Sequence, residues 1–245
     1  PLAQGALTGK YSGGKFPERS RASDPKRNRW MGDSLDAKRL AHIDQLNDIA
    51  IDIPDIATTL TDRFWAGALT LVLKKHPNIP LNITSGMDTI AVRMPDHPVA
   101  LALLRLSGLP IGAPSANTFS RPSPTTAQHV MDDLDGHVDM VLDGGRSSIG
   151  VESTILSLVS DVPTLLRPGG VSLEALREVL PNIVYHPQYL SEDAETVPSS
   201  GTLLKHYSPT AVVILFRGDD DTQFGQWNNN DFTGLSMQYK FHSYV

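Results

Sequence analysis

Short apolar runs alternate with glycine-rich and hydroxyl-rich loops between residues 89 and 154 of this 245-residue chain. The stretch opens with TIAVRMPDHP, continues through IGAPSANTFSRPSPTTAQHV and closes with DGGRSSIGVESTI. Runs of this length fit strands, and segments with helical spacing of apolar residues separate them. Alternation of strands and helices predicts an α/β fold. The hydroxyls, the arginine and the glycines of the loops suit a pocket for an anionic, hydroxyl-bearing ligand.

The same alternation extends to both sides of this stretch. Strands are predicted at 69–74, at 89–95, within 109–117, and in VDMVLDGG, STILSLV and PTLLRPGG. Helices are predicted at 35–50, in a short segment with Ala57, Leu60 and Phe64 on one side, at 97–108 with Gly108 as the stop, at 123–136 with Ser123 as the cap, and at 172–180 with Ser172 as the cap.

Composition excludes several classes of protein. The chain has no cysteine, so disulfides and cysteine-based zinc sites are excluded. No apolar run approaches the ~18 residues of a membrane span, and no signal peptide is recognisable, which predicts a cytoplasmic protein without membrane contact. No GxxxxGK[ST], GxGxxG or HExxH motif occurs, so we expect no metal ligands from the protein. The net charge of −6 argues against extensive non-specific nucleic-acid binding.

Charge and periodicity divide the chain into unlike parts. Residues 1–50 carry nine basic and six acidic residues, a net charge of +3, whereas the remainder carries 12 and 21, a net charge of −9. Residues 1–34 are polar and rich in glycine and proline, so we expect a loop that packs poorly on the rest. Residues 188–210 lose all periodicity and are typical of a linker. AVVILF at 211–216 then predicts the start of a second domain, truncated within 211–245.

Several motifs occur in a fixed order: TxAVRxP, APSAN, SPTT, GVEST and, in the linker, KHYSP. Together they resemble the threonylcarbamoyl-adenylate synthase family, of the long type with a YrdC-like domain and a second domain. The resemblance covers about residues 53–210. It implies a YrdC-like twisted mixed sheet with a concave pocket at 51–187, without the family's N-terminal part.

Members of this family make threonylcarbamoyl-adenylate from L-threonine, bicarbonate and ATP, and they release pyrophosphate. The resemblance therefore implies a nucleotidyltransferase of tRNA modification, with ATP bound as its Mg²⁺ complex. It also implies an RNA contact and a partnership with the downstream tRNA threonylcarbamoyl-transfer machinery. Such chemistry needs positioning and charge stabilisation more than covalent catalysis, so no catalytic side chain is expected.

The motifs also imply individual contacts. Threonine would contact Arg93, whose planar fork suits a carboxylate, together with Ala113 and Ser153. The remaining residues are expected at ATP (Thr89, Ser115, Ser123, Arg167, Tyr207) or in support (Asn117, Glu152). Ordinary structural roles stay open for each: a strand arginine often sits in a solvated ion pair, and Ser123 also fits a helix cap.

The first 50 residues have a different resemblance. PLAQGALTGKY followed by PERSRAS is similar to a segment of the aldo-keto reductases. A reductase barrel takes ~250 residues, so this fragment cannot form one. We interpret residues 1–50 as a reductase-like piece, mostly loop with one helix, joined to the synthase region by a fusion or by a gene-model error. The alternative is a genuine functional extension of the synthase region.

Three departures from the synthase pattern lower the expected activity. The family's FPTETVYGLG-like strand and K-x-R clamp do not occur, FWAGALTLVL replaces FWPGPLTLVL, and Phe119-Ser120 replaces Ser-Gly. We therefore expect weak or no synthesis by this chain. One alternative is a non-catalytic RNA- or nucleotide-binding YrdC-like module. Another is a reductase-derived protein that binds NADP.

Overall fold

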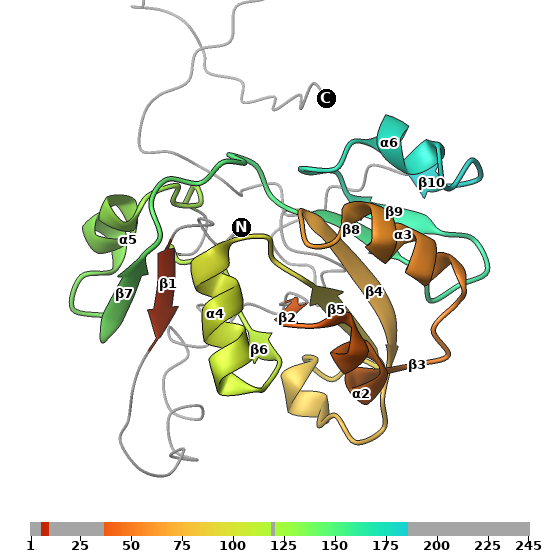
Figure 1. The fold of residues 1–245 in the computed structure, drawn as a ribbon, viewed down its shortest axis with the longest axis horizontal. Coiled ribbons are helices and arrows are strands. Elements are labelled where there is room, and N and C mark those ends of the chain that lie inside the picture. The colour runs from red at the N-terminus through yellow and green to blue at the C-terminus, as the bar shows by residue number, and fades with distance from the viewer. Residues whose placement is uncertain (1–5, 10–36, 119–120, 186–245) are drawn as a thin grey trace, which may run out of the picture. The chain divides into compact units, whose positions relative to one another are not determined.

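The computed structural model describes residues 6–9, 37–118 and 121–185 (Figure 1). The chain forms two compact units, Pro1–Pro209 and Thr210–Val245, and all described residues belong to the first. The predictions for Tyr207, the linker and the second domain therefore lie outside the described residues, as does most of 1–36.

A mixed β-sheet forms the centre of the first unit. Its strands follow the order β10–β9–β8–β4–β5–β2–β6, and β3 also pairs with β4. The pairs β10–β9, β2–β5 and β4–β8 are parallel, and the other pairs are antiparallel. The bounds are β2 Lys38–Arg39, β3 Ala50–Ile51, β4 Leu69–Lys75, β5 Thr89–Arg93, β6 Ile111–Gly112, β8 Thr154–Ser157, β9 Thr164–Arg167 and β10 Val184–Tyr185. The predicted α/β class with a mixed sheet is confirmed.

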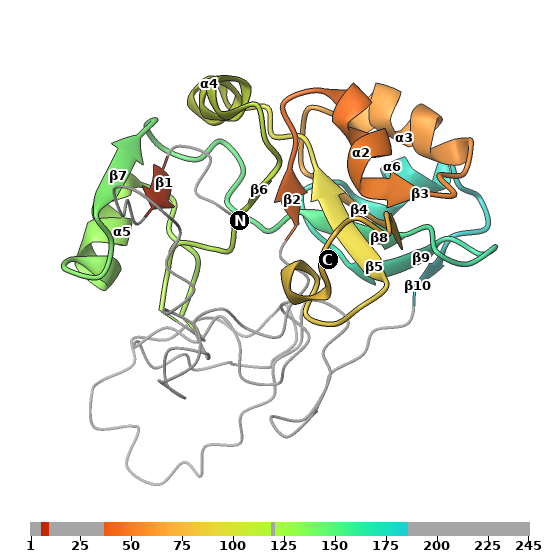
Figure 2. The same cartoon turned by 90° about the horizontal axis from the view of Figure 1, so that it is seen from below.

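Helices cover one face of this sheet, here called the helix-covered face. Figure 2 shows α2 (Leu46–Ile49), α3 (Ile56–Phe64) and α6 (Leu173–Arg177) gathered on the same side of the strands. Alternate residues of β4 and β5 point to these helices, because side chains along a strand alternate between its faces. The resulting core includes Leu69, Leu71, Leu73, Ile90, Val92, Leu60 and Leu176.

The intervening residues of the same strands form the opposite face, here called the polar face. It carries Arg39, Thr70 and Arg93 next to a small apolar cluster of Val72, Ala91, Ile155 and Ala37. This face is the part of the sheet that positions the candidate site.

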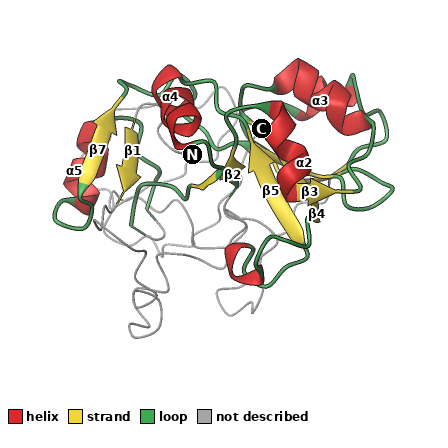
Figure 3. Ribbon diagram, turned by 60° about the horizontal axis from the view of Figure 1, so that its bottom comes forward, coloured by secondary structure: helices red, strands yellow, loops and turns green. Residues whose placement is uncertain are grey.

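A second group of elements includes the remaining described strands. Strand β1 (Ala6–Gly9) pairs antiparallel with β7 (Met140–Asp143), and α5 (Ala127–Leu134) packs on β7 (Figure 3). Helix α4 (Pro98–Ser107) ends at Gly108, whose φ of 66° is left-handed and favours glycine. The predicted helix stop at Gly108 is confirmed. Strand β1 lies where loop was expected, so that expectation is wrong for residues 6–9.

The helix predicted at 35–50 is wrong. This segment forms strand β2, a short 3₁₀ turn at Ile43–Gln45 and then α2. The Gln45 side chain accepts hydrogen bonds from the backbone of Ala41 (2.8 Å) and His42 (3.2 Å), so helical structure begins after residue 42. Pairing with distant strands holds residues 38–39 extended, and local periodicity does not report such pairing.

The predicted N-terminal cap is confirmed for α6 and wrong for α5. Ser172 caps α6 as predicted, since its side chain accepts from Ala175 N at 3.2 Å. Helix α5 instead begins after Thr126, whose hydroxyl accepts from His129 N at 3.2 Å. Ser123 is therefore not the cap, and its hydroxyl is directed elsewhere.

Candidate anion-binding site on the polar face of the sheet

Strand register places basic and hydroxyl side chains side by side on the polar face. Arg39 of β2 lies opposite Arg93 of β5, and the β4–β5 register puts Thr70 next to Arg93. Thr70 lies opposite Ile155 in β8, and Ile155 lies opposite Arg167 in β9. Directly opposed residues in neighbouring strands are close, so this row brings three guanidinium groups to one region of the sheet.

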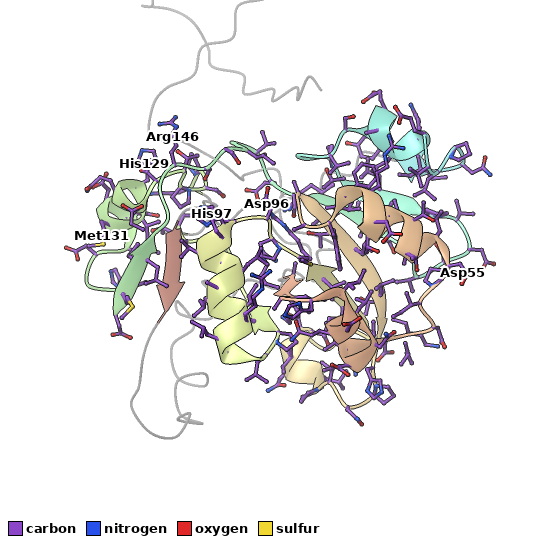
Figure 4. The ribbon with its side chains drawn as sticks, in the orientation of Figure 1. Asp55, Asp96, His97, His129, Met131 and Arg146 are labelled. Atoms are coloured by element: carbon purple, nitrogen blue, oxygen red, sulfur yellow. The ribbon has the colours of Figure 1, made fainter. Side chains whose placement is uncertain are left out.

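Arg93 is a buried cation, and its two terminal nitrogens can still donate hydrogen bonds to a ligand. Its side chain is only 5% exposed, and its Nε donates to Gly67 O at 2.7 Å. Within the described ranges, neither terminal nitrogen of Arg93 has a hydrogen-bond partner. Burial lowers the pKa of Arg93 to about 10, although Asp96, in the loop between β5 and α4 (Figure 4), acts to raise it and Arg167 adds to the lowering. Arg93 is thus charged at neutral pH and suits a two-oxygen anion such as a carboxylate.

Arg167 organises the second part of the site. Its Nη2 donates to Ser153 O at 2.8 Å and to Ser153 Oγ at 3.2 Å, and Nε donates to the same carbonyl at 3.1 Å. Glu152 Oε2 lies 3.9 Å from Arg167 Nη2, and Glu152 Oε1 accepts from Ser123 Oγ at 2.9 Å. Glu152 therefore links the SPTT loop to the Ser153–Arg167 pair.

The glycine after Pro168 lets the two loops approach. A Cβ at Gly169 would lie 2.3 Å from Glu152 O and 2.6 Å from Thr154 N. Any other residue there would push the RPGG turn away from the VEST segment, and with it Arg167 away from Ser153.

The APSAN loop carries the third part of the site. Arg39 Nη2 donates to Ala113 O at 3.2 Å, which ties the loop to the arginine next to Arg93. Asn117 Nδ2 donates to the carbonyls of Thr118 (2.8 Å) and Arg121 (3.1 Å). These bonds fix its amide, and Asn117 Oδ1 is buried with no partner among the described residues. A buried unpaired acceptor favours a ligand that donates a hydrogen bond.

The predicted site residues fall into three groups. Ser123, Glu152, Ser153 and Arg167 are connected by hydrogen bonds and an ion pair. Arg93 interacts electrostatically with Arg167, and Ala113 accepts a hydrogen bond from Arg39. Ser115 and Asn117 lie on the same loop as Ala113, with Ser115 exposed.

Thr89 lies opposite Lys74 at the other end of β5, four residues or ~13 Å from Arg93. The contact of Thr89 with ATP stays a prediction.

Two site residues escaped the sequence analysis. Arg39 stands in the segment that was expected to be a helix, so its strand register could not be inferred. Thr70 is the only polar residue in the apolar run LTLVL, and its hydroxyl lies 2.8 Å from Ser153 Oγ. A lone hydroxyl within a buried strand was a signal that could have marked Thr70.

The described residues contain neither a metal-binding cluster nor a membrane-spanning helix. In the parts of the chain that the structure describes, no three His, Asp or Glu side chains are grouped so as to hold a metal ion. No helix of these parts is both long and apolar enough to cross a bilayer.

The fold resembles solved YrdC-like structures. The chain is similar to Sua5 of P. abyssi complexed with L-threonine, with a TM-score of 0.69 and 45% identity over 73% of this chain and 53% of that one. E. coli YciO shares the fold, with a TM-score of 0.55 over 69% of this chain and 81% of that one. The structure thus defines a YrdC-like α/β domain.

Family comparison agrees with the fold. The Sua5/YciO/YrdC family model, described as "Telomere recombination", matches residues 37–169, which is more than half of the chain. This chain belongs to that family. The model for the threonylcarbamoyl-AMP synthase C-terminal domain matches residues 171–240. The family region begins at residue 37 and includes 37–52, earlier than the start near 53 inferred from the motifs.

This chain matches part of the length of its named relatives. Threonylcarbamoyl-AMP synthase of Bacillus subtilis is 48% identical over 183 residues, which are 74% of this chain and 53% of the relative. The Pyrococcus abyssi enzyme of the same name is 46% identical over 182 residues, with 74% and 54% covered. The chain spans about half the length of the curated relatives it matches.

Proposed function

We propose that this chain carries the site of a threonylcarbamoyl-AMP synthase, which joins L-threonine, bicarbonate and ATP. The observation that supports this most is Arg93, a buried cation whose two terminal nitrogens have no hydrogen-bond partner among the described residues and whose charge interacts with that of Arg167. The similarity to P. abyssi Sua5 complexed with L-threonine supports threonine as the ligand.

The proposed roles follow the chemistry of the side chains. Arg93 holds the threonine carboxylate, with Ser153 and Ala113 beside it. ATP is contacted by five residues: Thr89, Ser115, Ser123, Arg167 and Tyr207. Asn117 and Glu152 hold these contacts in place. Mg²⁺ enters on the ATP phosphates, because magnesium commonly binds through substrate phosphates.

Carbamate formed from threonine and bicarbonate attacks the α-phosphorus, and the bond to the pyrophosphate leaving group breaks. The chain's part is to hold these groups in line and to spread the phosphate charge. We propose slow turnover, since no segment similar to the family's K-x-R clamp occurs among residues 1–36. Cytoplasmic location, an RNA contact and the tRNA threonylcarbamoyl-transfer machinery as partner belong to the same proposal.

The test is threonine-dependent pyrophosphate release by the purified chain with ATP and bicarbonate. We expect slow release that Arg93→Ala abolishes and that Arg105→Ala, at an exposed arginine of α4, leaves unchanged. Calorimetry separates this function from a non-catalytic RNA- or nucleotide-binding module: a synthase binds threonine more tightly when ATP is present, and the module does not. Threonine-independent nucleotide binding without release would refute the proposal.

A further inference from the structure

We infer that Thr70 fixes the direction of the Ser153 hydroxyl, so that Ser153 always offers its proton to the ligand. Thr70 is then a positioning residue that makes this subsite selective for hydrogen-bond acceptors. The inference deepens the proposed function and rests on it only for the identity of the ligand, which is the carboxylate or carbamate oxygen of threonine.

The Thr70 hydroxyl has one hydrogen-bond acceptor within reach among the described residues. The Thr70 side chain is 0% exposed, and its Oγ1 lies 2.8 Å from Ser153 Oγ. Among the described residues, Thr70 Oγ1 has no other partner. A buried hydroxyl whose proton finds no acceptor is costly, so Thr70 donates to Ser153 and not the reverse.

Ser153 then receives two hydrogen bonds at the same oxygen. Arg167 Nη2 donates to Ser153 Oγ at 3.2 Å, and a guanidinium can only donate. A serine hydroxyl has two acceptor lone pairs and one proton. With both lone pairs engaged by Thr70 and Arg167, the Ser153 proton is the group that remains for a ligand.

The surroundings of Ser153 agree with this direction. Ser153 keeps 7% exposure where Thr70 has none, so the pair meets ligand space at Ser153. Arg93, next to Thr70 in the strand register, adds two terminal nitrogens that have no partner in the described part of the chain. The subsite thus presents N–H and O–H groups, which match carboxylate oxygens and disfavour an ammonium or amide N–H.

Calorimetric titration of L-threonine in the presence of ATP tests the inference with five variants. Thr70→Val keeps the shape and removes the hydroxyl, so we expect ~tenfold weaker binding, as for one hydrogen bond. Thr70→Ser keeps the donor and should bind within about twofold of the wild type. Thr61→Val is the matched control, because Thr61 is also buried but donates to Thr58 O in α3.

The remaining two variants, Ser153→Ala alone and combined with Thr70→Val, distinguish a positioning role of Thr70 from a purely structural one. In a Ser153→Ala background, Thr70→Val should cause no further loss, since Thr70 acts through Ser153. Unchanged threonine affinity in Thr70→Val, or an equal loss in both backgrounds, would overturn the inference.

Failure of the wild type to bind threonine would refute the proposed ligand alone. Proton NMR then shows which of the two hydroxyls donates in the Thr70–Ser153 hydrogen bond. We expect a slowly exchanging Thr70 hydroxyl signal with a cross-peak to the Ser153 β-protons. Its absence would overturn the inference independently.

Discussion

The two faces of the central sheet are made by the same strands but have different tasks. Leu71 and Val92 point into the helix-covered face and are 0% exposed, whereas Thr70 and Arg93, one residue away, belong to the polar face. Apolar burial on one face supplies stability, and the basic and hydroxyl groups of the other face form the proposed binding site. A step of one residue along β4 or β5 should therefore change which property a substitution affects.

The largest expected effect is on the helix-covered face. Leu71→Ala should lower the free energy of unfolding by ~2–5 kcal/mol, because it removes buried methyl groups and leaves a cavity. Urea denaturation measures this. Leu106→Ala, at an 88% exposed leucine of α4, is the control and should change stability by less than ~0.5 kcal/mol. Equal losses for both leucines would break the distinction between buried core and surface.

On the polar face, Arg167→Met should weaken ATP binding by ~100-fold, since it removes the charged donor that we propose for the phosphates. Glu152 would also lose the cation 3.9 Å away. Fluorescence or calorimetric titration with ATP gives the measurement. The control is Arg177→Met, at an exposed arginine in the last turn of α6. An effect of similar size at Arg177 would show that net charge and not the site controls affinity.

The pKa of Arg93 predicts a pH dependence that sharpens the comparison. Arg93 loses its proton near pH 10 when folded and at a higher pH when unfolded, because burial disfavours the charge. Above pH 10 the unfolded chain binds more protons, so the contribution of Arg93 to stability rises, by at most ~1.4 kcal/mol per pH unit. The unfolding free energy of the wild type minus that of Arg93→Met should be flat from pH 8 to 9.5 and rise toward pH 11. A fall over that range would contradict this.

The smallest effect concerns the loop next to the polar face. Asp133 of α5 accepts from both the backbone N–H and the hydroxyl (2.8 Å) of Thr118, and Arg121 lies 3.7 Å away. Asp133→Ala should release the loop and weaken ATP binding by ~fivefold, about 1 kcal/mol, with threonine affinity unchanged. Asp132→Ala, at an exposed neighbour that accepts from Gln128, is the control. Equal loss of threonine affinity would mean that the loop serves both ligands.

Local patterns in the sequence predicted the elements whose structure is decided locally. The strand with Leu71, the helix that ends at Gly108 and the Ser172 cap follow from periodicity and capping chemistry. Arg93, Ser153 and Arg167 came from motifs, and the structure brings them together.

The remaining features depend on contacts between distant residues. Strand β2 has two residues and exists through pairing with β5 and β6, so a helical spacing of leucines was misleading. Thr70 meets Ser153 across 83 residues.

One pair of adjacent substitutions tests the central claim most directly. Val92→Ala and Arg93→Met are compared with the wild type for unfolding free energy and for L-threonine affinity in the presence of ATP. We predict a crossed result: Val92→Ala loses ~2 kcal/mol of stability and keeps threonine affinity, whereas Arg93→Met loses ~100-fold in affinity and keeps its stability at pH 7. Parallel changes, with both variants losing stability or both losing threonine, would contradict the division of labour between the two faces.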